Sequence, residues 1–199
     1  PVHRRERMDY IGVRRVDENG EIIGMSRLIG LFTTKAYAEP ASETPVLHRK
    51  LRQILASEDL IEGSHDYKAA VSLFESFPKD ELFAAPIEDL RRAVVSLLGL
   101  QAEQGRVLGR RDGDGRSASV IVALPKGRYD ATLLDRLSAF LRSRFDASAV
   151  DAHEVLGEQD RVRVHFTVHR PEGDLPEVSF RELEAEVLDL TQTWDDRAR

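Results

Sequence analysis

Residues 161–169 alternate without a break between polar and apolar side chains. The apolar set is Val162, Val164, Phe166 and Val168, and the polar set is Arg163, His165, Thr167 and His169. Successive side chains of a β-strand point to opposite faces of a sheet, so this period of two predicts a strand with one face on a core. We interpret the polar set as a solvated sheet face.

Further elements flank this strand in a regular order. Strands are expected at 105–111 and 117–124, joined by the turn Asp112-Gly113-Asp114-Gly115, and another at 150–156. Asp130 can cap a helix before the third strand, and Ser179 with Glu182 forms a capping box for a final helix. The apolar faces of these two helices are Leu133, Leu134, Leu137, Phe140 and Leu141, and Phe180, Leu183, Val187, Leu190 and Trp194.

The resulting element order is ββαββα. Moving the first strand to the end gives βαββαβ, the ferredoxin-like order, in which the last strand lies antiparallel beside the first. A strand placed ahead of that unit can fill the same position in the sheet. We therefore expect an α+β fold, with one four-stranded antiparallel sheet and helices on one face.

The N-terminal region has the pattern of a β-hairpin. The strand from Tyr10 ends at Asp17-Glu18-Asn19-Gly20, and Asn-Gly supplies the positive φ angles of a tight turn. The return strand, 21–33, is apolar on both faces, which predicts that it is buried. The Asp-x-x-Gly turn recurs at Asp112 to Gly115, so we interpret the hairpin as half of a degenerate repeat. Its other half is expected upstream of Pro1 or from a partner chain, and its open edges predict a homo-oligomer.

The middle of the chain is predicted to be helical. A helix from Pro45 has the stripe Leu47, Leu51, Ile54 and Leu55. Ser64 can cap the next helix, which Pro78 ends; a turn at 80–83 follows, and Pro86 opens another helix at its first position. We expect a partial half-module at 1–60, a helical connector at 61–102 and an α+β domain at 103–199.

Composition narrows the classes of partner. The net charge is −6 and the pI about 5.6, which argues against a nucleic-acid partner because phosphate binding needs a basic face. The chain has no cysteine, and no apolar run approaches the roughly 20 residues that span a bilayer. We expect a cytoplasmic protein with no membrane contact. The absence of an initial methionine is what an excised piece of a longer chain would show.

The sequence contains no pattern typical of a catalytic, dinucleotide-binding or metal-binding site. Gly113-Asp114-Gly115 lies in a strand-to-strand turn and lacks the third glycine of a dinucleotide site. His165 and His169 share a strand face but would lie about 13 Å apart, too far for one metal ion. His65-Asp66 is interpreted as the first turn of a helix. We expect no catalytic, cofactor-binding or metal-binding residue.

One turn is a candidate ligand-binding site. The segment Pro125-Lys126-Gly127-Arg128-Tyr129-Asp130 places two cations and a glycine just before a helix, where free N–H groups can hold a carboxylate. The candidate effector-binding residues are Lys126, Gly127, Arg128 and Asp130. The alternative is a plain turn in which Asp130 caps the helix and occupies the donors itself.

With these segments in view, the chain resembles the N-terminal region of the large bacterial NAD-dependent glutamate dehydrogenases, along nearly its whole length. The segments that carry the resemblance are 9–15 (DYIGVRR), 27–37 (RLIGLFTTKAY), 64–69 (SHDYKA), 77–83 (FPKDELF), 110–112 (RRD), 124–129 (LPKGRY) and 163–166 (RVHF).

The resemblance implies ACT-like domains ahead of a catalytic dehydrogenase domain. It implies a parent enzyme that converts L-glutamate to 2-oxoglutarate and ammonia with NAD, and a piece that contacts other domains and subunits of that parent. ACT domains bind amino acids at inter-domain surfaces, which would make an amino acid the effector. No catalytic or NAD-binding segment of the family matches here. The alternatives are an RNA-binding or protein-interaction ferredoxin-like module, or a small enzyme with an unrecognised site.

Overall fold

A computed structural model describes residues 9–30, 33, 35, 38–156 and 160–192. The chain divides into two compact units, Pro1–Pro40 and Ala41–Arg199. The first unit contains a two-stranded sheet. The second contains a group of helices followed by a four-stranded sheet with two further helices.

The first unit is the predicted hairpin. β1 (Asp9–Val16) pairs antiparallel with β2 (Ile22–Gly30), and one residue is bulged on β2 beside Arg15 and Val16. Gly20 has φ 84° and donates its N–H to the carbonyl of Asp17 at 3.1 Å, which closes the turn. The prediction that the return strand is buried is wrong, because eight of its nine residues are exposed. Among the described residues, β2 pairs only with β1.

The helical part of the second unit begins at Ala41. It comprises the 3-10 turn η1 (Ala41–Glu43) and the helices α2 (Pro45–Ser57), α3 (His65–Glu75), α4 (Lys79–Ala84) and α5 (Ile87–Leu98). The apolar stripe of α2 is buried as predicted, and the Ser64 side chain accepts the N–H of Tyr67 as the predicted cap.

Two details of this part differ from the predictions. Residues 80–83, expected as a turn, lie within α4, whose Leu82 is fully buried. Pro86 precedes α5 as its cap residue instead of occupying the first helical position. Both differences are confined to a few residues. Burial of Leu82 stabilises the short helix α4, and the sequence pattern does not show that burial.

The remainder of the unit is the predicted ββαββα arrangement. The strands β3 (Arg106–Arg111), β4 (Ser117–Pro125), β5 (Ala149–Leu156) and β6 (Arg161–His169) form one antiparallel sheet in the order β3-β4-β6-β5. The short turn η2 (Lys126–Arg128) leads into α6 (Ala131–Arg144), and α7 (Phe180–Leu190) follows β6. Asp130 and Ser179 accept N–H groups in the first turns of α6 and α7, as their cap positions predict. Trp194 lies outside the described residues.

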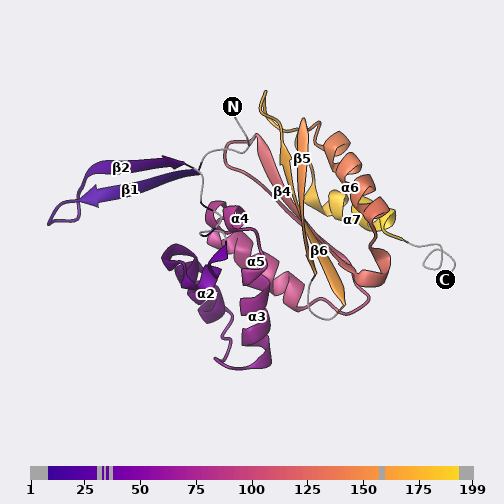
Figure 1. The fold of residues 1–199 in the computed structure, drawn as a ribbon, viewed down its shortest axis with the longest axis horizontal. Helices are drawn as coiled ribbons and strands as arrows, with labels where there is room; N and C mark the ends of the chain where they lie inside the picture. The colour runs from indigo at the N-terminus through magenta and orange to yellow at the C-terminus, as the bar shows by residue number, and fades with distance from the viewer. Residues whose placement is uncertain (1–8, 31–32, 34, 36–37, 157–159, 193–199) are drawn as a thin grey trace. The chain divides into compact units, whose positions relative to one another are not determined.

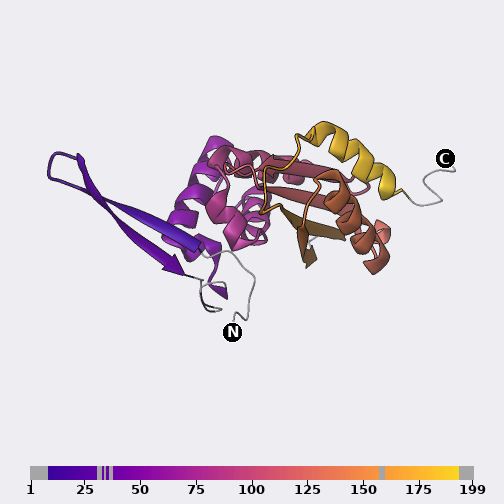
Figure 2. The ribbon, with the colours of Figure 1, turned by 90° about the horizontal axis from the view of Figure 1, so that it is seen from above.

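Both faces of the sheet are covered. α6 and α7 lie on one face (Figures 1 and 2), over a core that includes Val120, Leu137 and Phe166. On the other face, Ile121 and Ala123 of β4 join the core of the helices α2–α5. The expected solvated face is therefore wrong: Arg163 is 9% exposed and His165 is 3% exposed. The helical segment that precedes the sheet in the sequence removes this face from water.

Gly109 on β3 allows α7 to approach the sheet closely. A Cβ added to Gly109 would lie 2.1 Å from Cδ1 of Phe180, so no side chain fits there without movement of that ring. We expect Gly109→Ala to lower the free energy of unfolding by about 1–3 kcal/mol, through overpacking. The shift of the urea midpoint measures this. Gly113→Ala is the matched control, because its Cβ would meet nothing within 4 Å; an equal loss in both variants would contradict the packing argument.

Candidate functional site

The contact between the helical segment and the sheet contains a buried ion pair. Arg110 on β3 and Glu81 on α4 form two bonds, Nε–Oε1 at 2.8 Å and Nη2–Oε2 at 2.7 Å, and Arg110 also bonds Asp112. The two paired side chains are only 11% and 14% exposed. Burial by itself would lower the pKa of Arg110, but the bonds and charges of Glu81 and then Asp112 outweigh burial and leave that pKa raised. The guanidinium therefore stays charged in the interior.

Lys50 closes the end of α4 at the same interface. Its ammonium Nζ donates to the carbonyls of Leu82, Phe83 and Ala85 at 2.7, 3.1 and 2.8 Å. Burial, and then the nearby charge of Arg110, lowers the pKa of Lys50. A cation at a helix C-terminus satisfies carbonyls that have no partner within the helix.

Arg161 forms a third connection, between β6 and the segment that leads from α5 to β3. It donates to the carbonyls of Leu100 and Gln104, each at 3.0 Å, and to that of Gln101. The residue is 9% exposed, and burial lowers the pKa of its guanidinium. Three backbone carbonyls therefore stabilise one buried cation, which holds the segment between α5 and β3 at β6.

His165 lies on the same covered face. Its ring meets the ring of Phe77 edge-on, with centroids 5.0 Å apart, and neither ring nitrogen has a hydrogen-bond partner. Burial, followed by the charges of Arg163 and His153, lowers the pKa of His165 to about 3. The imidazole is therefore neutral at physiological pH. Across the described residues, no group of three His, Cys, Asp or Glu side chains could hold a metal ion.

The predicted effector residues come together in one turn at the opposite end of β4 from the β3–β4 hairpin. Lys126, Gly127 and Asp130 are exposed and Arg128 is half-buried. Asp130 Oδ1 accepts the N–H of Leu133 at 2.7 Å, and the N–H of Lys126 donates to the carbonyl of Asp160 at 2.7 Å. The N–H of Tyr129 also donates, to the carbonyl of Lys126 at 3.1 Å. Three of the backbone donors that the prediction relied on are therefore occupied, while the Lys126 side chain remains accessible.

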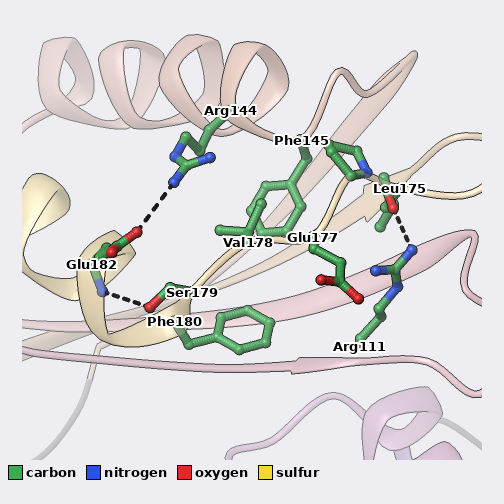
Figure 3. Close-up of a pocket in the computed structure, with 10 residues that line it drawn as sticks. Arg111, Arg144, Phe145, Leu175, Glu177, Val178, Ser179, Phe180 and Glu182 are labelled. Atoms are coloured by element: carbon green, nitrogen blue, oxygen red, sulfur yellow. Dashed lines mark hydrogen bonds and ion pairs between the residues drawn. The ribbon is translucent and has the colours of Figure 1, made fainter.

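Sequence reasoning missed a groove at the start of α7 (Figure 3). The groove has a volume of about 550 Å³ and combines two arginines, two glutamates and apolar walls. It is lined by Arg111, Arg144, Phe145, Leu175, Pro176, Glu177, Val178, Ser179, Phe180 and Glu182. A small zwitterion would match this mixture of charges. No local pattern marks the groove, because β3, the end of α6 and the loop before α7 each contribute to it.

Its charged side chains are already engaged with protein groups. Arg111 donates to the carbonyls of Gly115 and Leu175, and Arg144 lies 3.1 Å from Glu186 and 3.9 Å from Glu182. A ligand would have to compete with these contacts.

In the part of the chain that is described, no helix is long and apolar enough to cross a membrane.

Comparison with known proteins matches both parts of the second unit to one family. Residues 44–103 match glutamate dehydrogenase helical motif 1, which spans α2–α5, and residues 106–195 match the glutamate dehydrogenase ACT2 domain, which spans β3–α7.

Three relatives, all called NAD-specific glutamate dehydrogenase, align with most of the chain. The protein of Halomonas elongata is 30% identical over 98% of this chain, and that of Pseudomonas aeruginosa is 26% identical over 98%. The protein of Mycobacterium tuberculosis is 25% identical over 86%. The chain spans only 11–12% of the length of these relatives. The chain belongs to the NAD-specific glutamate dehydrogenase family, as the resemblance indicated, and corresponds to the segment that contains helical motif 1 and the ACT2 domain.

Proposed function

We propose that this chain is a non-catalytic regulatory and scaffolding segment of an NAD-dependent glutamate dehydrogenase. The parent enzyme converts L-glutamate to 2-oxoglutarate and ammonia in the cytoplasm, with NAD bound in a catalytic domain outside these residues. The segment contacts other domains and subunits of a homo-oligomeric parent. The names of the relatives and the small share of their length that the chain covers support this assignment.

The observation that carries the scaffolding role is the buried join between helical motif 1 and the ACT2 sheet. Arg110–Glu81 and Arg161 connect the two by charge-assisted bonds, and the three side chains involved are largely buried. Buried ion pairs add little net stability, but their geometry allows few alternative arrangements. We infer that the two modules move as one rigid body, which is what a structural connector between domains requires.

The RNA-binding alternative is disfavoured by the same interface. RNA-recognition sheets use an open face with exposed aromatic side chains for base stacking. Here that face carries buried Arg163 and His165, and Phe77 packs against His165. A domain with this face covered, in a chain of net charge −6, lacks the surface that such binding uses.

Regulation in this proposal uses an amino acid held by its carboxylate at the turn of Lys126, Gly127, Arg128 and Asp130. Lys126 is exposed, and a Cβ added to Gly127 would meet nothing within 4 Å, so a ligand has room to approach. The groove beside Arg144 is the other place that offers charges of both signs to a zwitterion.

A thermal-shift screen of the 199-residue chain against the twenty amino acids and NAD(H) tests the regulatory part. A binder at about 100 times its Kd is expected to add about 2.7 kcal/mol to stability. The shift is expected to disappear in Lys126→Ala/Arg128→Ala and to persist in Arg144→Gln. No shift with any amino acid would contradict sensing, and loss of the shift only in Arg144→Gln would move the site to the groove. Glutamate-dependent NADH formation by this chain alone would contradict the non-catalytic assignment.

A further inference from the structure

The β1–β2 hairpin exposes most of its large apolar side chains to solvent. Nine large apolar side chains on its two strands are 40–64% exposed. They are Tyr10, Ile11, Val13, Val16, Ile22, Ile23, Met25, Leu28 and Ile29. The strand register puts Ile11 opposite Leu28 on one face and Tyr10 opposite Ile29 on the other, so both faces are apolar. A two-stranded hairpin is marginally stable alone, and apolar patches of this kind mark contact surfaces.

The β3–β4 hairpin shows what would complete such a structure. Its turn is closed by the same kind of bond: Gly115 has φ 70° and donates to the Asp112 carbonyl at 3.0 Å, as Gly20 with φ 84° donates to the Asp17 carbonyl at 3.1 Å. Like β2, β4 has nine residues and is apolar on both faces. β4 is buried because β6 pairs with its second edge and helices cover both faces. β2 therefore has the composition of a central strand without a strand at its second edge in the described residues.

We propose that β1–β2 is the outer hairpin of a second sheet, completed by a strand from another segment of the same parent polypeptide that pairs with the free edge of β2. The proposal rests on the proposed function only in requiring that this chain is part of a longer polypeptide. The chain covers 12% of the length of two of its relatives, so most of such a polypeptide lies outside it and can contain the pairing strand.

A second copy of this chain is the poorer occupant. Edge-to-edge pairing of two hairpins would add strands but no helix, and both apolar faces would remain in water. The helices α2–α7 already bury their apolar faces within residues 41–199. A segment of the parent can supply both a strand and a covering helix, as the β3–β6 sheet illustrates.

The backbone pattern identifies positions for a test. The N–H of Asp17 donates to Glu21 at 2.9 Å across the hairpin, and backbone groups alternate in direction along a strand. From the register, the backbone groups of Arg27 then point to the free edge of β2, and those of Arg14 to the free edge of β1. Proline at either position removes one outward N–H without breaking the hairpin's own ladder. Arg14→Pro is therefore a matched control for Arg27→Pro.

Hydrogen–deuterium exchange of residues 22–30, in the full-length parent and in the 199-residue chain, tests the proposal. We expect exchange at least about a hundredfold slower in the parent, with Arg27→Pro removing that protection and Arg14→Pro retaining it. Equal, rapid exchange in both proteins would overturn the proposal. So would protection in the 199-residue chain that increases with concentration, which is the signature of a second copy. Loss of protection only in Arg14→Pro would place a partner at β1 instead. Glutamate oxidation by the parent is measured separately, so a failed functional assignment does not affect this readout.

Discussion

Replacement of Glu81 by alanine is expected to lower the free energy of unfolding by about 3–5 kcal/mol, because it leaves a buried guanidinium without its main partner. Arg110 would retain Asp112 alone, and its charge would face the ammonium of Lys50 without the compensating carboxylate. Urea denaturation at neutral pH measures the loss. Since Glu81 joins α4 to β3, the same variant should also weaken protection of the sheet face that the helices cover.

Two further variants separate this effect from a general cost of removing glutamates. Glu88 on α5 is exposed and pairs with Arg91 of the same helix, so Glu88→Ala is expected to change stability little. The double variant Glu81→Leu/Arg110→Met replaces both charges by apolar groups and is expected to be much less damaging than Glu81→Ala alone. If Glu81→Ala is as mild as Glu88→Ala, the pair does not hold the two modules together.

Acidification is expected to destabilise the fold through His165. The pKa of this residue is about 3 in the folded state, against about 6.5 in an unfolded chain, so only the unfolded state binds the proton between these values. Stability is therefore unaffected well above pH 6.5 and falls as pH decreases from about 6.5 toward about 3, by up to about 1.4 kcal/mol per pH unit. Between about pH 7 and about pH 5 this amounts to about 2 kcal/mol.

Carboxylates also titrate in acid, so the contribution of His165 to the pH dependence of stability is measured by comparing variants. His165→Leu should lose the part of the pH dependence that comes from His165. At neutral pH this variant should be at least as stable as the unsubstituted chain, because two unpaired buried nitrogens are removed. His153→Gln is the matched control, since His153 opposes His165 on β5 but is exposed. An unchanged pH slope in His165→Leu would show that His165 is accessible to protons in the folded state.

The secondary structure of this protein could be predicted because its signals are local. The alternation at 161–169, the stripe of α2, and the caps Ser64, Asp130 and Ser179 act within a few residues of the backbone they organise. The ββαββα order follows directly from these elements. The candidate effector-binding residues were chosen from the same kind of signal; they lie in one turn, where three of the backbone donors are already used, and ligand binding there stays a prediction.

The burial of particular faces did not follow from local signals. Arg163 and His165 have the pattern of a solvated face, but Phe77 and the helices around it cover them. β2 has the pattern of a buried strand, but the described residues leave it exposed. The sequence by itself determined the strands, the helices other than α4, their order and the family, since periodicity, caps and motifs are properties of short segments. Only the tertiary structure decided which polar side chains enter the interior, because that depends on contacts between segments far apart in the chain.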